Sequence, residues 1–112
     1  MTMQLTKKHC VPCEGGEHPL QGLSLQKYIS QLHTPWEQRD GGRKIYRAFK
    51  FKDFAGAMRF ANQIATIAEQ EGHHPDLHVA WGKVGVELWT HVIGGLTEND
   101  FILAAKIEEL QR

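Results

Sequence analysis

The chain has 112 residues, a length typical of one domain with a single hydrophobic core. Thirteen Lys and Arg residues balance thirteen Asp and Glu residues, and a formal net charge of zero argues against nonspecific nucleic-acid binding and against a polybasic membrane patch. With 41% hydrophobic and 23% charged residues, the composition is that of a folded globular protein rather than a disordered one.

Residues 1–22 are predicted to form an irregular N-terminal arm, and residues 23–112 a single folded domain. Prolines and glycines recur along the arm and disfavour a long helix or strand in it; they are Pro12, Gly15, Gly16, Pro19 and Gly22. No run approaches the roughly 18 apolar residues of a transmembrane helix, and Met1 to Pro12 lacks the apolar stretch of a signal peptide. We therefore expect a cytoplasmic protein.

The arm carries the two cysteines of the chain, Cys10 and Cys13, in a Cys-x-x-Cys motif. One close pair is too little for the disulfide framework of a secreted protein, which agrees with a reducing compartment. The motif is half of a zinc knuckle, and no second Cys-x-x-Cys completes it. A small zinc-binding protein organised by these two cysteines stays open as an alternative.

A short helix is expected after the arm. Ser24 is placed to be its N-cap, and the helix should run to about Leu32. Leu23 and Tyr28 are spaced to pack on each other across its first turn.

Two strands of a hairpin are then predicted between positions 36 and 51. The turn falls on residues 40–42, which tolerate a positive φ. In the second strand Ile45, Phe49 and Phe51 share one face, as a strand with one buried side requires, although Arg47 interrupts the apolar row.

A longer helix is predicted over residues 53–71. Asp53 can cap its first turn, and Gly72 stands where helices end in the left-handed conformation. Apolar residues recur at spacings of three and four, so one face of the helix must be buried; they are Phe54, Ala57, Met58, Ala61, Ile64, Ala65 and Ala68.

A second hairpin follows this helix. Apolar residues alternate along its first strand from Leu77 to Trp81, and Gly82-Lys83 is expected to form a two-residue turn. On the second strand, the same alternation places Val84, Val86, Leu88 and Thr90 on one face. His91 therefore falls on the opposite face from Thr90.

The last helix is predicted to begin at a capping box made by Thr97 and Asp100, with Leu96 and Phe101 packed together across its start. The elements thus follow the order helix, hairpin, helix, hairpin, helix. This order predicts an α+β fold with a four-stranded antiparallel sheet and three helices on one face.

Protonatable and polar side chains gather where the 53–71 helix and the second hairpin end; they are Glu69, His73, His74, Pro75, Asp76, Thr90 and His91. Because histidine titrates near neutrality, such a cluster can act as both acid and base. Zinc could also use three histidines, but no His-x-x-x-His pair or carboxylate at a standard spacing supports a metal here.

Three stretches of the sequence closely resemble the pterin-4a-carbinolamine dehydratases: Glu71 to Asp76, Trp89 to His91, and Gly94 to Phe101. The Cys-x-x-Cys-x-Gly-Gly arm is similar to that of bacterial members. The resemblance implies the same α+β fold and a hydro-lyase, 4a-hydroxytetrahydrobiopterin dehydratase. Such an enzyme removes water from 4a-hydroxytetrahydropterin to give quinonoid dihydropterin, without a metal or an organic cofactor.

By the same resemblance, the catalytic residues are His73, His74 and His91, with Pro75 and Thr90 lining the pterin pocket and Glu69 as a supporting carboxylate. The family further implies a homodimer or homotetramer and a link to an aromatic amino acid hydroxylase whose pterin is recycled. We expect His73 and His91 to move the protons and His74 to hold the ring. A non-catalytic module that dimerises and binds a partner remains the competing interpretation.

Overall fold

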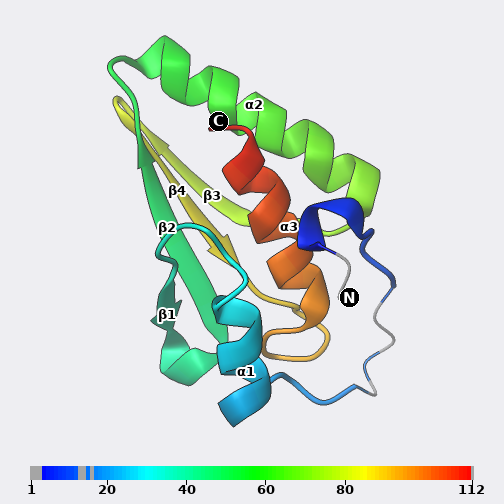
Figure 1. The fold of residues 1–112 in the computed structure, drawn as a ribbon. Coiled ribbons are helices and arrows are strands. Elements are labelled where there is room, and N and C mark those ends of the chain that lie inside the picture. Colours follow the sequence, from blue (N-terminus) through cyan, green and yellow to red (C-terminus); the bar gives the residue numbers. More distant parts are fainter. Residues whose placement is uncertain (1–3, 13–14, 16, 112) are drawn as a thin grey trace.

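The computed structural model describes residues 4–12, 15 and 17–111 of the chain (Figure 1). The elements in chain order are the short 3₁₀ helix η1 (Leu5–Lys7), α1 (Gly22–Ile29), β1 (Glu37–Arg39), the 3₁₀ turn η2 (Asp40–Gly42), β2 (Lys44–Lys50), α2 (Phe54–Glu71), β3 (Asp76–Ala80), β4 (Lys83–Leu88) and α3 (Glu98–Glu109). The predicted α+β fold is confirmed. None of these described helices is long and apolar enough to span a membrane.

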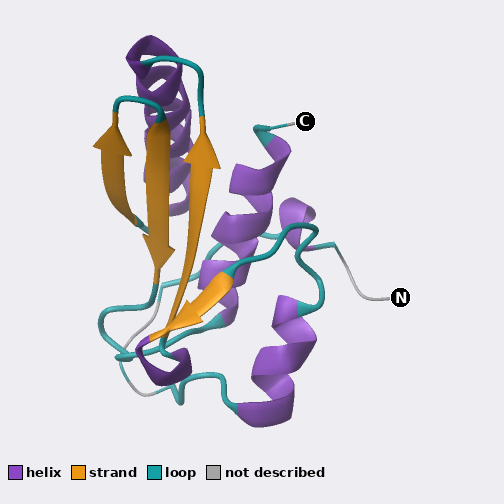
Figure 2. Ribbon diagram, turned by 90° about the vertical axis from the view of Figure 1, so that its left-hand side faces the viewer, coloured by secondary structure: helices purple, strands orange, loops and turns teal. Residues whose placement is uncertain are grey.

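Within the described residues, the strands form one antiparallel sheet in the order β1-β2-β4-β3. Ile45 of β2 pairs with Leu88 of β4, and Leu77 of β3 pairs with Val86 of β4. The helices lie to one side of this sheet (Figures 1 and 2). The sheet turns a row of buried side chains toward them: Ile45, Phe49, Val84, Val86 and Leu88.

Helix α1 begins three residues earlier than the sequence predicts. The N-cap is Gln21, and Ser24 lies in the first turn, where its hydroxyl accepts a hydrogen bond from the Gln21 N–H at 3.3 Å. The predicted Ser24 cap is therefore wrong, because Gly22 adopts a positive φ of 56° and turns the chain into the helix before Ser24 is reached. Leu23 is 89% exposed and does not pack on Tyr28.

Helix α2 has the ends that the sequence predicts. The Asp53 side chain accepts a hydrogen bond from the Gly56 N–H at 2.7 Å, and Gly72 ends the helix with φ 65° and ψ 26°. Of the predicted apolar face, Ala57, Ala61, Ile64 and Ala68 are buried, but Phe54, Met58 and Ala65 are exposed. Only part of that face therefore belongs to the core.

The turn of the second hairpin is displaced by one residue from the prediction. Ala80 pairs with Lys83, so the two central residues are Trp81 and Gly82 rather than Gly82 and Lys83. The backbone directly after β2 explains the displaced turn. Phe51 donates its N–H to the Gly82 carbonyl at 2.8 Å, and a Cβ on Gly82 would lie 2.9 Å from the Phe51 carbonyl oxygen. Trp81 is left exposed at the tip.

Helix α3 is buried on nearly all sides because η1, α1 and α2 all contact it. The predicted capping box is confirmed, with the Thr97 N–H donating to Asp100 at 2.9 Å. Its polar residues Asn99, Asp100 and Glu108 are also buried. Burial of such groups requires hydrogen-bond partners inside the protein, and for the first two these partners lie in the candidate site.

Candidate functional site

Four segments meet beyond the C-terminal end of α2 and surround an open pocket of about 230 Å³. They are the loop after α2, the chain that leaves β4, the start of α3 and part of the N-terminal arm. The lining residues are Val11, Pro12, Gly72, His73, His74, Trp89, Thr90, His91, Val92 and Asn99. The three histidines expected to work together therefore share one pocket. A larger hollow of about 580 Å³ lies between α1 and η2, and no histidine is among its lining residues.

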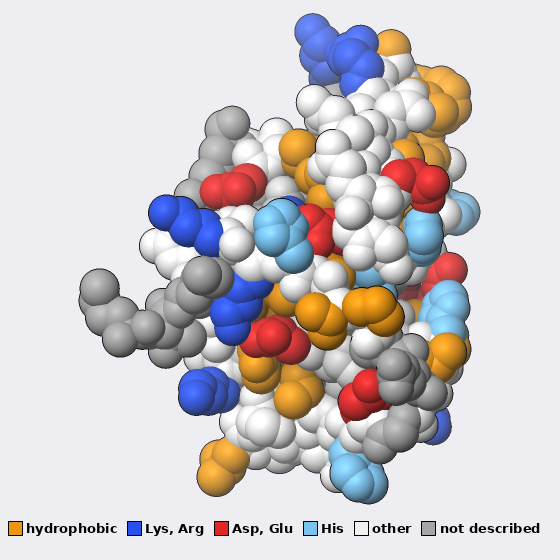
Figure 3. Space-filling view, turned by 90° about the vertical axis from the view of Figure 1, so that its right-hand side faces the viewer, with side chains coloured by type: hydrophobic (Ala, Val, Ile, Leu, Met, Phe, Trp, Pro, Cys, Tyr) orange, Lys and Arg blue, Asp and Glu red, His pale blue; other side chains and the backbone are white. Residues whose placement is uncertain are grey.

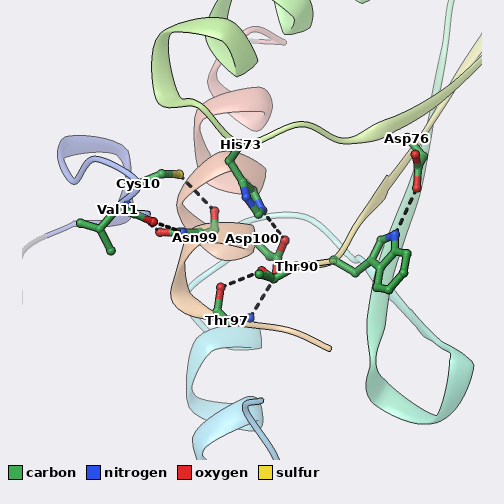
Figure 4. Close-up of polar contacts among 9 residues, drawn as sticks. Cys10, Val11, His73, Asp76, Thr90, Thr97, Asn99 and Asp100 are labelled. Atoms are coloured by element: carbon green, nitrogen blue, oxygen red, sulfur yellow. Dashed lines mark hydrogen bonds and ion pairs between the residues drawn. The ribbon is translucent and has the colours of Figure 1, made fainter. Parts of the chain in front are cut away.

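His73 is held at the pocket by the way α2 ends. The left-handed Gly72 reverses the chain, and the His73 N–H donates to the Ala68 carbonyl at 3.2 Å. The His73 side chain is 12% exposed and places Nε2 2.6 Å from Oδ1 of Asp100 (Figure 4). An ionised carboxylate only accepts, so Nε2 carries the hydrogen of this bond, and Nδ1 is the nitrogen left for a ligand.

Asp100 is the centre of a buried polar network. Its second oxygen, Oδ2, accepts from the Thr90 hydroxyl at 2.8 Å and from the Thr97 N–H at 2.9 Å. The two threonine hydroxyls are themselves 2.8 Å apart. The carboxylate is fully buried, so its position is fixed by these contacts, and it fixes the ring of His73 in turn.

His91 reaches the pocket from the chain that leaves β4. β4 ends at Leu88, and the chain beyond it keeps the predicted alternation, with Thr90 buried and His91 exposed. The His91 ring lies against Trp89, with centroids 4.3 Å apart, and the Trp89 Nε1 donates to Asp76 at 3.1 Å. Asp76 and Trp89 thus support the ring of His91 from β3 and the end of β4.

His74 is at the outer edge of the pocket. Its Nε2 lies 2.5 Å from Oε2 of Glu69, and both side chains are exposed, by 60% and 76%. A contact between two side chains this exposed contributes little to stability. Glu69 and Pro75, the other predicted site residues, are described by the structure but are not among the lining residues of the pocket.

Two more carboxylates lie under the N-terminal arm, next to the pocket. Burial raises the pKa of Glu71, but the Cys10 N–H, His9 and Lys106 lower it by more, so the pKa lies below its ordinary value. The pKa of Glu98 is also lowered, first by the hydrogen bond from Lys8, against an opposing effect of burial, and further by Tyr28. Both groups therefore favour their charged forms while the arm is bound.

Several residues of this site were not predicted from the sequence: Val11, Pro12, Gly72, Trp89, Val92, Asn99 and Asp100. The sequence indicates Asp100 only as a helix cap. Asn99 had no signal, because its partner Val11 is 88 positions away in an irregular segment.

A metal-binding role gains no support from the described part of the chain, in which no three His, Cys, Asp or Glu side chains are grouped to hold an ion. Cys13, one half of the Cys-x-x-Cys motif, lies outside the described residues. Cys10 approaches the Asn99 carbonyl with its Sγ at 3.5 Å. Histidine side chains are visible on the face that the arm crosses (Figure 3).

Comparisons with known proteins agree on one family. The sequence profile described as Pterin 4 alpha carbinolamine dehydratase matches residues 18–110. A Rickettsia canadensis protein named for this dehydratase is 53% identical over 104 residues, which cover 93% of this chain and 94% of that protein. The crystal structure of a transcriptional coactivator/pterin dehydratase from Brucella melitensis matches with a TM-score of 0.77 and 36% identity, over 83% of this chain and 98% of that one.

A more distant structure shares the fold alone. It is a pterin dehydratase-like protein identified as a RuBisCO assembly factor in the α-carboxysome. It matches with a TM-score of 0.60 and 22% identity, over 70% of this chain and 90% of that one. The same fold therefore also occurs in a protein with an assembly role, and the chemistry of a chain must be argued from its site.

Proposed function

The chain belongs to the pterin 4 alpha carbinolamine dehydratase family, and from this membership we propose that it removes water from 4a-hydroxytetrahydropterin at the pocket of His73, His74 and His91. The observation that carries the proposal is the convergence of the His73–Asp100 pair and His91 on one pocket. An interaction module would have no need of a buried carboxylate that orients an imidazole at the wall of a pocket.

The reaction needs one proton delivered and one removed. The substrate carries a hydroxyl on a carbon next to a ring nitrogen. An acid protonates that oxygen, the carbon–oxygen bond breaks, and the electron pair of the nitrogen forms the new carbon–nitrogen double bond. The nitrogen then loses its proton to a base, so that one water leaves and the protein keeps its total number of protons. Proton exchange with solvent returns the acid and the base to their starting forms.

We assign the two proton transfers to His73 and His91. Asp100 holds the His73 ring in one orientation and one tautomer, and its charge can balance the imidazolium that forms when Nδ1 takes a proton. His91 lines the same pocket, with its ring against that of Trp89. We propose that His74 holds the ring of the substrate. Thr90 contributes indirectly, because its hydroxyl donates a hydrogen bond to Asp100, which orients His73.

The test follows quinonoid dihydropterin formation from freshly prepared carbinolamine, with and without the protein. General acid–base catalysis contributes about 10²- to 10⁴-fold, so His73→Ala and His91→Ala should each lower kcat by that range. His78→Ala is the matched control, because His78 is an exposed histidine on β3 outside this pocket. The rate of the spontaneous reaction is subtracted from each measurement. If the remaining rate of His91→Ala equals that of the wild type, the assignment of His91 to proton transfer is wrong.

Three further roles are part of the proposal. We propose that the protein works in the cytoplasm, that it recycles the pterin of an aromatic amino acid hydroxylase, and that it assembles into homodimers or homotetramers. Sedimentation measures the assembly directly. Elemental analysis for zinc decides whether Cys10 and Cys13 bind a metal instead.

A further inference from the structure

We propose that the N-terminal arm forms a substrate-binding wall of the pocket, and that Asn99 and Glu71 are the residues that position it. The inference deepens the proposed function and rests on it, because the wall has a role only if the pocket binds a pterin. The arm residues that reach the pocket are Val11 and Pro12.

Asn99 holds the arm by its backbone. Its Oδ1 accepts the Val11 N–H at 3.0 Å, and its Nδ2 donates to the Val11 carbonyl at 2.6 Å (Figure 4). The residue is 5% exposed. A buried side-chain amide that bonds both the backbone N–H and the backbone carbonyl of one residue fixes the path of the main chain at that residue. The side chain of the bound residue does not matter for this contact.

Glu71, at the end of α2, holds the preceding residues in the same way. Its Oε1 accepts the Cys10 N–H at 2.7 Å, and its Oε2 lies 3.0 Å from Nδ1 of His9. Lys106 of α3 is 3.6 Å from this carboxylate and also donates to the Thr6 carbonyl at 3.0 Å. The Glu71 side chain is 6% exposed, so a second buried polar group is committed to the arm backbone.

The rest of the arm is anchored as well. Leu5 is buried in the main core, and Lys8 pairs with Glu98 at 2.8 Å. The contacts of residues 5–10 fix the chain up to the pocket, yet Val11 itself is 65% exposed. An exposed apolar side chain at the edge of a pocket, whose backbone is held by two hydrogen bonds to the buried Asn99 side chain, is suited to contact a flat heterocycle.

This arrangement predicts an effect on binding rather than on the chemical step. A wall contacts substrate and transition state alike, so its loss raises KM and leaves kcat nearly constant, whereas loss of a proton-transfer residue lowers kcat. The two classes of residue are therefore separable by kinetics.

The experiment measures kcat and KM for two variants. Asn99→Leu removes both hydrogen bonds at similar volume, and Val11→Trp fills the pocket from an exposed position where folding should be unaffected. Each should raise KM about 5-fold or more with kcat within about twofold. Hydrogen exchange should show a less protected Val11 amide in Asn99→Leu. Asn62→Leu, on the exposed face of α2, is the matched control and should keep the wild-type KM.

The outcomes separate the two claims. If the wild-type protein does not accelerate dehydration, the proposed function has failed and the wall has no role in it. If the wild type is active but Val11→Trp keeps the wild-type KM, the wall is refuted. The same holds if either variant lowers kcat at constant KM. Should Asn99→Leu fail to fold, Val11→Trp alone decides.

Discussion

Asp100→Asn should abolish most of the dehydratase activity while leaving the protein folded. The Asn oxygen can take the place of Oδ2 and keep the bonds from the Thr90 hydroxyl and the Thr97 N–H. The amide NH₂ then occupies the position of Oδ1, 2.6 Å from Nε2 of His73. Because an NH₂ group only donates, Nε2 must become the acceptor and the ring must take the opposite tautomer.

The expected loss in kcat is about 10²- to 10⁴-fold, the range for misdirecting one general acid–base group. The loss in stability is smaller. Exchanging charge-assisted hydrogen bonds for neutral ones costs about 1–2 kcal/mol, which lowers Tm by roughly 4–8 °C in a chain of this size. Steady-state kinetics and thermal unfolding of the same sample measure both quantities.

Glu108→Gln is the matched control for this prediction. Glu108 is a second buried carboxylate of α3, at the opposite end of the helix, and accepts from the backbone N–H groups of His33 and Thr34 and from Trp36 Nε1. It should lose a comparable amount of stability and keep kcat within about twofold. If Asp100→Asn keeps the wild-type kcat, or if Glu108→Gln loses as much activity, the orienting role of Asp100 is wrong.

Two other predictions concern the arm and the end of α2. Because the pKa values of Glu71 and Glu98 are lowered in the folded protein, their contribution to binding the arm is complete at neutral pH and is lost as the pH falls below the ordinary value of 4.5. Hydrogen-exchange protection of the Cys10 amide should drop there before that of α2; equal protection at pH 6 and pH 3.5 would contradict this. Gly72→Ala should cost about 1 kcal/mol, read from thermal unfolding, because Gly72 has φ 65°, and an unchanged Tm would show that an Ala fits there without strain.

The sequence predicts best those features that are decided by neighbours along the chain. The Asp53 cap, the left-handed Gly72 and the Thr97–Asp100 box depend on groups within a few positions, and each occurs as predicted. The convergence of the histidines also follows from local rules, because a helix exit and a strand end with known face alternation place them.

The failures come from contacts that the local pattern does not contain. The turn at Trp81 is set by the approach of the Phe51 backbone from another strand. The bond between Asp100 and His73 joins residues 27 positions apart, and the clamp of Asn99 on Val11 joins an irregular segment to a helix. Neither has a periodicity from which it could be predicted.

The first turn of α3 makes the geometry of the candidate site depend on how that helix begins. The carboxylate that closes this turn with Thr97 is the one that steadies His73. A chain that had formed its sheet but not the turn at residues 97–100 would lack the bond between Asp100 and His73, and by the proposed mechanism its turnover would stay reduced until that turn closed. The start of the helix and the proposed catalysis therefore depend on the same carboxylate.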